Sequence, residues 1–316
     1  MSTSEVPISE TPISEKPTRG VPADGAARGR TSIPVARGPR GLSTRLLRSE
    51  LRLVFGRRRN QALLAALACV PVLIAVAIRL SEGGGGRRGG DGDGPAFIGQ
   101  IAGNGLFVAF TALVVTLPLF LPLAVSVASG EAVAGEASIG TLRSLLVVPV
   151  GRTRLLVVKF AGIVAFAVAA ALTVGAAGVL IGFALFPIGP VTLLSGGTLG
   201  VGAALVRVLL VALYVAAMLT GLASIGLFAS TLTEVPIAAM AVTAITAVVV
   251  QILDAVPQIA VIHPYLLTDW WLRFGDLLRD PVVYGDMTRG LLVTAAYIAV
   301  FGALAWARLG TKDVSS

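Results

Sequence analysis

The sequence has few of the side chains that bind metals or act as catalytic nucleophiles. His263 is its only histidine and Cys69 its only cysteine, so a paired-histidine zinc centre, an intrachain disulfide and a cysteine-based metal site are all excluded. The sequence also lacks the GxSxG string that presents a serine nucleophile. We interpret His263, which precedes Pro264, as a solvated loop residue, and Cys69, which lies in an apolar run, as a small membrane-facing or packing residue. An intramembrane protease is therefore not expected, and neither is any catalytic or metal-binding residue.

The sequence motif for ATP binding and hydrolysis is missing as well. ATP hydrolysis by a P-loop needs GxxxxGK[ST], in which backbone amides and a lysine hold the phosphates and a hydroxyl binds magnesium. No such string occurs. The stretch LLSGGTLG, residues 193–200, is similar to the LSGGQ sequence of some ATPases, but no nucleotide-binding fold surrounds it, and we interpret it as a glycine-rich turn. Any ATPase, with its ATP and Mg²⁺, must be another polypeptide, and no cofactor is expected in this chain.

The composition is that of an integral membrane protein. Of the 316 residues, 55% are hydrophobic and 13% charged, and several apolar runs approach or exceed the ~20 residues that cross a bilayer. These runs predict an all-α fold with six transmembrane helices. Their limits are 61–80, 104–129, 157–186, 203–230, 235–256 and 290–308.

The chain ahead of the first span divides in two. Residues 1–40 are rich in Pro, Ser, Gly and charge and predict a disordered tail, too long for the following apolar run to be a cleavable signal. Residues 41–59 place leucines at helical spacing between arginines, which predicts an amphipathic helix in the membrane interface. Behind it we expect a six-span domain at 60–308 and a tail at 309–316. The net charge of +8 comes largely from arginines beside the first span, so it indicates lipid rather than nucleic acid as the partner.

Basic residues also predict the topology. They crowd before the first span, and the next loop has few, so the N-terminus is expected in the cytoplasm, and six spans return the C-terminus there. The loop 131–156 then lies inside and the loop 257–289 outside. Within the outer loop, residues 266–279 have apolar side chains close to helical spacing, which predicts an interfacial helix with Trp270 and Trp271 at headgroup level. A substrate gate is the alternative interpretation of this segment.

Prolines and glycines predict the shape of individual spans. Pro118 and Pro122 lie one turn apart and should kink the second span, and Pro71 could kink the first. Gly178 and Gly182 form a GxxxG pair that permits close helix approach, within the chain or at a subunit contact.

The most structured polar segment is the internal loop GEASIGTLRSLLVVPVGRTRLLVVK, residues 135–159. A short helix parallel to the membrane fits it, with Glu136 near the positive N-terminal end and Pro149 near the stop. Such a helix could receive a mechanical push from a soluble partner. On spacing alone, a simple connector fits equally well.

The order of residues in this loop resembles the signature of type-2 ABC transporter permeases, the membrane subunits of many bacterial ABC exporters. The resemblance rests on Gly135-Glu136, then on a string of the form GTL..LL..PV.R..LL..K that runs to Lys159. It implies that the loop contains a coupling helix, which docks on a separate ATPase subunit. The residues implied to contact that ATPase are Glu136, Gly140, Thr141, Leu142, Leu145, Leu146, Pro149 and Arg152.

The resemblance also implies a function. The chain would be a permease subunit in the bacterial cell membrane, paired with itself or with a sister permease. Its spans are poor in charge and carry scattered hydroxyls and amides, which suits export of an amphipathic or hydrophobic molecule. The alternatives are an ion-coupled carrier and a membrane scaffold. A carrier is disfavoured because Glu131, Arg207, Glu234 and Asp254 all lie near predicted span ends.

Overall fold

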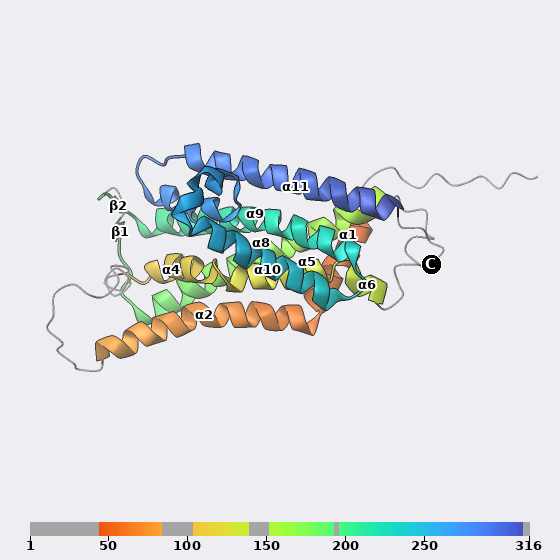
Figure 1. The fold of residues 1–316 in the computed structure, drawn as a ribbon. Helices are drawn as coiled ribbons and strands as arrows, with labels where there is room; N and C mark the ends of the chain where they lie inside the picture. The colour runs from red at the N-terminus through yellow and green to blue at the C-terminus, as the bar shows by residue number, and fades with distance from the viewer. Residues whose placement is uncertain (1–43, 84–103, 139–151, 193–195, 312–316) are drawn as a thin grey trace, which may run out of the picture. The chain divides into compact units, whose positions relative to one another are not determined.

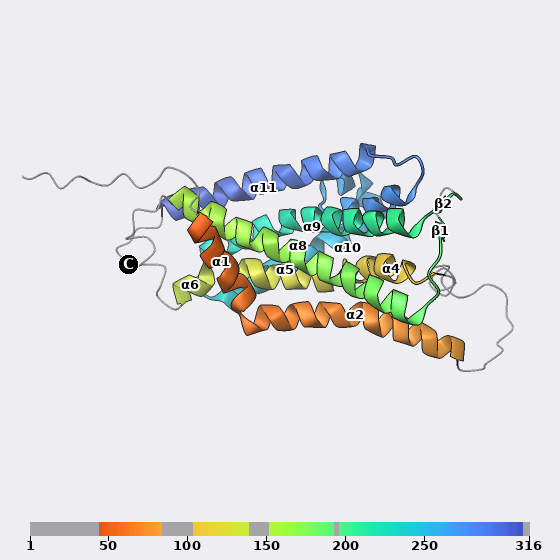
Figure 2. The same ribbon diagram turned by 180° about the vertical axis from the view of Figure 1, so that it is seen from behind.

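The computed structural model describes residues 44–83, 104–138, 152–192 and 196–311 (Figures 1 and 2). The described residues all belong to one compact unit, Gly41–Ser316. Its α-helices are α1 (Thr44–Gly56), α2 (Arg58–Gly83), α4 (Phe107–Thr116), α5 (Phe120–Gly130), α6 (Ala134–Ser138), α8 (Arg152–Leu185), α9 (Val201–Leu232), α10 (Pro236–Asp254) and α11 (Gly285–Thr311). Three 3₁₀ helices, η1 (Pro257–Tyr265), η2 (Thr268–Trp270) and η3 (Arg273–Leu278), and two short strands, β1 (Val191–Thr192) and β2 (Thr198–Leu199), complete the secondary structure of the described ranges.

The long helices are those expected of a multi-pass membrane protein. Five of them, α2, α8, α9, α10 and α11, are long and apolar enough to cross a bilayer, and α4 with α5 makes a sixth span if the bent pair is counted as one. Each overlaps a span predicted from the sequence. The largest differences are at two starts, because α8 begins at Arg152 rather than 157 and α11 at Gly285 rather than 290. Polar first turns extend these helices beyond their apolar runs.

Helix α9 is the centre of the bundle. Of its most apolar stretch 78% is buried, against 17% for α10 and α11. It packs against α8, α11, α5 and α10, and α8 in turn packs against α2, α4 and α1 (Figures 1 and 2). The buried core is built from alanine, valine, leucine and phenylalanine of these helices, such as Phe166, Leu219 and Leu222. The peripheral helices leave apolar faces outward, as lipid-facing surfaces do.

The second span is broken, as its prolines predict. Helix α4 ends at Thr116 and α5 begins at Phe120, and the two differ in direction by 57°. Pro118 lies in the break, and Pro122 removes an amide from the first turn of α5. By contrast, α2 continues through Pro71 as a single helix.

The GxxxG pair of the third span packs inside the chain. A Cβ added to Gly182 would overlap the carbonyl oxygen of Gly105, and one added to Gly178 would lie 2.5 Å from the α-carbon of Ala109. Both neighbours belong to α4 or to the residues just before it. Internal packing is therefore confirmed for this pair, because only glycine allows the backbones to approach so closely.

The outer segment between α10 and α11 differs from the prediction of one interfacial helix. It folds as η1, η2 and η3, and Trp270, Trp271 and Phe274 are buried rather than lying at an exposed surface. Side chains of α9 take up its backbone carbonyls: Tyr214 donates to Trp270 at 2.8 Å, and Arg207 donates to Leu277 and, at 2.9 Å, to Arg279. The prediction of one continuous helix is wrong because these tertiary bonds, which no local pattern reveals, replace helical ones.

Candidate functional site

The structure describes only the two ends of the loop that the sequence analysis singled out. Glu136 lies in α6, at the start of the loop, and Arg152 is the first residue of α8, at its end. The remaining predicted contact residues lie outside the described residues; they are Gly140, Thr141, Leu142, Leu145, Leu146 and Pro149. We name the end of the bundle that carries α6 and the start of α8 the loop end. Helix α1 crosses α8 at this same end (Figure 2).

A buried ionic triad joins three elements at the loop end. The Nζ atom of Lys159, in α8, lies 3.0 Å from each carboxylate oxygen of Glu50, in α1, and also contacts Oε1 of Glu136, in α6. The side chains of Lys159, Glu50 and Glu136 are 4%, 11% and 9% exposed. An ammonium with three donors thus holds two carboxylates from segments far apart in the sequence.

A glycine makes room for the triad. Gly162 lies three residues after Lys159 on α8, and a Cβ added there would lie 3.0 Å from Cγ of Glu50 and 3.4 Å from Cγ2 of Val54. Residues three apart on a helix share a face. Helix α1 can therefore lie directly across α8, which brings the Glu50 carboxylate to the lysine.

The triad carries an excess of negative charge when all three groups are ionised. Burial raises the pKa of the Glu50 carboxyl above its ordinary value, and the Lys159 ammonium opposes that shift. The sequence pattern had placed Glu50 among the polar residues between the leucines of the interfacial helix. Its burial was missed because the partner, Lys159, comes from a helix more than a hundred residues later.

A serine fixes the chain just before Glu136. Oγ of Ser230, at the end of α9, accepts hydrogen bonds from the backbone N–H of Val133 (3.0 Å) and Ala134 (2.8 Å), and donates one to the carbonyl of Gly130 (2.8 Å). Ser230 is fully buried. One hydroxyl thus satisfies amides at the start of α6 that have no helical partner, and it ties the turn between α5 and α6 to the central helix.

Two arginines, Arg57 just before α2 and Arg59 in its first turn, pair with a carboxylate in that same turn. Arg57 and Arg59 each lie 2.5 Å from Oε2 of Glu131. Both arginine side chains are more than a third exposed, so solvent weakens these pairs, and we assign them a smaller share of the stability than the buried triad. They nevertheless link the first span to the end of the second.

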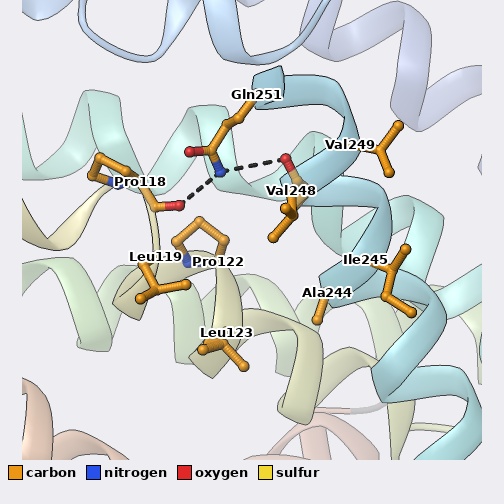
Figure 3. Close-up of a pocket in the computed structure, with 10 residues that line it drawn as sticks. Pro118, Leu119, Pro122, Leu123, Ala244, Ile245, Val248, Val249 and Gln251 are labelled. Carbon is orange, nitrogen blue, oxygen red and sulfur yellow. Dashed lines mark hydrogen bonds between the residues drawn. The ribbon is translucent and has the colours of Figure 1, made fainter. Parts of the chain in front are cut away.

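A separate apolar groove of about 240 Å³ lies between the broken span and α10 (Figure 3). Pro118, Leu119, Pro122 and Leu123 line one side, and Ala244, Ile245, Ala247, Val248 and Val249 line the other. The side-chain amide of Gln251 is its polar group, and it donates to the carbonyl of Pro118 at 2.6 Å and to that of Ala247 at 3.3 Å. Such a lining accommodates a hydrophobic molecule and offers one amide for orientation.

The histidine and the cysteine considered in the sequence analysis do not form a reactive site among the described residues. Nε2 of His263 lies 3.2 Å from the carbonyl oxygen of Val256, and Cys69 is exposed on α2. Among the described residues, no three His, Cys, Asp or Glu side chains are grouped as metal ligands. Several hydroxyls of the spans donate within their own helix, as those of Thr116, Thr243 and Thr246 do.

Comparison with known proteins agrees with this arrangement. The family model described as ABC-2 family transporter protein matches residues 57–250, which is more than half of the chain. The match includes the broken span, the loop, Lys159 and the central helix. No curated protein matches the sequence. With apolar helices that can cross a membrane several times, this chain belongs to the ABC-2 family of transporter permeases.

Proposed function

We propose that this chain is the membrane subunit of an ABC exporter, driven by ATP hydrolysis in a separate ATPase that docks on the loop 131–156. The observation that carries the proposal is the anchoring of this loop at its start. Glu136 is held by Lys159 of α8, which also holds Glu50 of α1, and Ser230 of α9 holds the turn before it. A force on the loop therefore reaches α1, α8 and α9 together.

The chemical step belongs to the partner in this proposal. ATP and Mg²⁺ bind the ATPase subunit, and this chain contributes no residue to phosphoryl transfer. Its own part is mechanical: α8 packs along α2, α4 and α9, so a displacement of α8 is passed to the broken second span. The break at residues 117–119 interrupts the helix and allows α4 and α5 to change their relative direction.

The substrate is proposed to be an amphipathic or hydrophobic molecule. The groove between α5 and α10 supports this, because its lining is apolar apart from the Gln251 amide. Helix α10 also presents an apolar outward face, on which Ile237, Ile245 and Ile252 are more than half exposed. A second permease subunit, of the same or a sister chain, would cover that face and close a path between two grooves.

The proposed setting is the bacterial cell membrane, with both termini and the loop end in the cytoplasm. The excess of arginine before α2 and in the loop supports this orientation. Placing the loop in the cytoplasm gives the ATPase access to it, and places the segment of η1, η2 and η3 on the outer side.

The test is purification of the tagged chain from its native membrane in mild detergent, followed by identification of bound proteins and by ATPase and transport assays. The double variant Leu142→Asp with Leu145→Asp should lose an ABC ATPase that the wild type retains. Ser144→Asp puts the same type of charge on the loop without changing a leucine and is the control. Transport by a preparation that contains no ATPase would replace the proposal with an ion-coupled carrier.

A further inference from the structure

A second apolar groove, of about 280 Å³, lies at the loop end on another side of the bundle. It is lined by Thr153, Leu156, Val157 and Phe160 of α8, Ser224 and Leu227 of α9, and Ile298, Gly302 and Trp306 of α11. Helix α11 lies entirely beyond the residues matched by the family model. None of the groove residues belongs to the ionic triad or to the groove beside Gln251.

This groove is open on the outside of the bundle. Val157 is 45% exposed and Trp306 54% exposed, so its walls are accessible from outside the helix bundle. A Cβ added to Gly302 would have no atom within 4 Å, so this glycine leaves open space in the groove instead of permitting close helix contact. The Trp306 indole donates to Oγ1 of Thr153 at 2.9 Å, and this bond ties α11 to the first turns of α8.

The depth of the groove matches part of one leaflet. From Trp306 to Ile298 is about 12 Å along the helix axis at 1.5 Å per residue. Half of a hydrocarbon core is roughly 15 Å thick. A tryptophan near one end fits the level of the headgroups, where indoles concentrate. A groove of this length, with Trp306 at the interface, would reach into the acyl-chain region of one leaflet.

Two arginines come shortly after groove residues in the sequence: Arg154 directly follows Thr153, and Arg308 lies two residues after Trp306. Arg154 lies in the first turn of α8, which has no acidic residue, and Arg308 lies in the last turn of α11. Nε of Arg154 is buried and has no hydrogen-bond partner among the described residues. Basic side chains at the level of the headgroups attract anionic lipids over zwitterionic ones.

We propose that this groove is a binding site for an anionic phospholipid, with one acyl chain along Phe160, Leu227 and Gly302 and the phosphate near Arg154 and Arg308. The lipid lies in the leaflet at the loop end, which is the cytoplasmic leaflet if the orientation proposed above is correct. Bound there, it covers the seam between α8 and α11, and α8 is the helix that carries Lys159.

The experiment measures quenching of tryptophan fluorescence by brominated lipids in vesicles containing the full chain. A minor fraction of brominated phosphatidylglycerol is compared with the same fraction of brominated phosphatidylcholine in a phosphatidylcholine bilayer. The chain has three tryptophans, of which Trp270 and Trp271 are buried, and subtraction of a Trp306→Phe sample isolates the signal of Trp306. We expect phosphatidylglycerol to be preferred at Trp306 by about five-fold per basic side chain.

Three variants make the result specific. Gly302→Leu, whose Cβ would meet no atom within 4 Å, puts a leucine in the wall of the groove and should abolish the preference. Ala303→Leu, an exposed neighbour that does not line the groove, should keep it. Arg154→Gln with Arg308→Gln should reduce the preference even though the groove stays open. Equal quenching by both lipids in the wild type, or an unchanged preference in Gly302→Leu, overturns the proposal. The assay uses neither ATPase nor substrate, so its failure would leave the proposed transport function standing.

Discussion

The side-chain amide of Gln251 replaces a backbone donor that Pro122 lacks. In an uninterrupted helix, the carbonyl of Pro118 would accept from the amide of residue 122, but proline has none. Nε2 of Gln251, from the last part of α10, donates to this carbonyl at 2.6 Å instead (Figure 3). The break in the second span is thus held by a helix that follows it by more than a hundred residues.

Gln251→Leu should loosen this junction. The substitution leaves the Pro118 carbonyl without its donor, and an unsatisfied polar group away from water costs about 1–3 kcal/mol. We expect a lower thermal unfolding midpoint and altered stimulation of ATPase activity by hydrophobic substrates. Thr246→Ala, which removes an exposed hydroxyl on the same helix, is the control. Identical behaviour of both variants would show that the hydrogen bond to Pro118 does not support the break.

The ionic triad should respond unequally to loss of its members. Lys159→Met leaves the Glu50 and Glu136 carboxylates buried against each other, and breaking a buried pair in this way costs about 3–5 kcal/mol. Glu50→Gln leaves a neutral Glu136–Lys159 pair and should cost far less. Chemical unfolding in detergent measures both. If Lys159→Met were as stable as Glu50→Gln, the lysine would not be holding the two carboxylates.

The pH dependence of stability should carry the signature of Glu50. Its pKa is raised by burial above the ordinary 4.5, so the folded protein keeps a proton that the unfolded chain releases. The corresponding stabilisation is fully present below pH 4.5 and is lost as the pH rises through the raised pKa. Lys159, Glu136 and Arg57 face this carboxyl, and they stay in the Glu50→Gln control. The difference in unfolding midpoint between wild type and control should change across this window, and parallel curves would exclude Glu50 as the titrating group.

Ser230→Ala should uncouple the loop from the central helix. It removes the acceptor for the buried amides of Val133 and Ala134, at about 1–3 kcal/mol for each amide left unsatisfied. We expect ATP hydrolysis to continue with less transport per ATP, because the turn before Glu136 is no longer fixed to α9. Ser230→Thr keeps the hydroxyl and should retain more of the coupling. If Ser230→Ala transported as much per ATP as the wild type, the hydrogen bonds of Ser230 would not be needed to couple the loop to α9.

Gly182→Ala should destabilise the protein strongly. The new methyl group would overlap the Gly105 carbonyl oxygen, so backbone must move, and overpacking of this kind costs about 1–3 kcal/mol or more. Gly202→Ala, where nothing lies within 4 Å of the added carbon, is the matched control. Comparable unfolding midpoints for the two variants would contradict the close approach of α8 to the segment that begins α4.

Patterns that depend on neighbouring residues were predictable from the sequence. The apolar runs located the spans, because a bilayer sets their length, and Pro118 with Pro122 located the break. The amphipathic segment expected at 41–59 contains helix α1, Thr44–Gly56. The order of residues around Glu136 identified the family, which the match at residues 57–250 confirms.

The sequence by itself therefore determined the class of protein, the positions of its spans and the family. Only the tertiary structure decided which polar groups meet: Glu50 with Lys159, Gln251 with Pro118, and Ser230 with the turn before Glu136. The same holds for the outer segment. Its apolar spacing predicted a helix, but it forms 3₁₀ helices whose backbone carbonyls accept hydrogen bonds from Tyr214 and Arg207. The physical reason is that span formation follows from local hydropathy, whereas a buried polar group must find a partner wherever the packing of distant helices provides one.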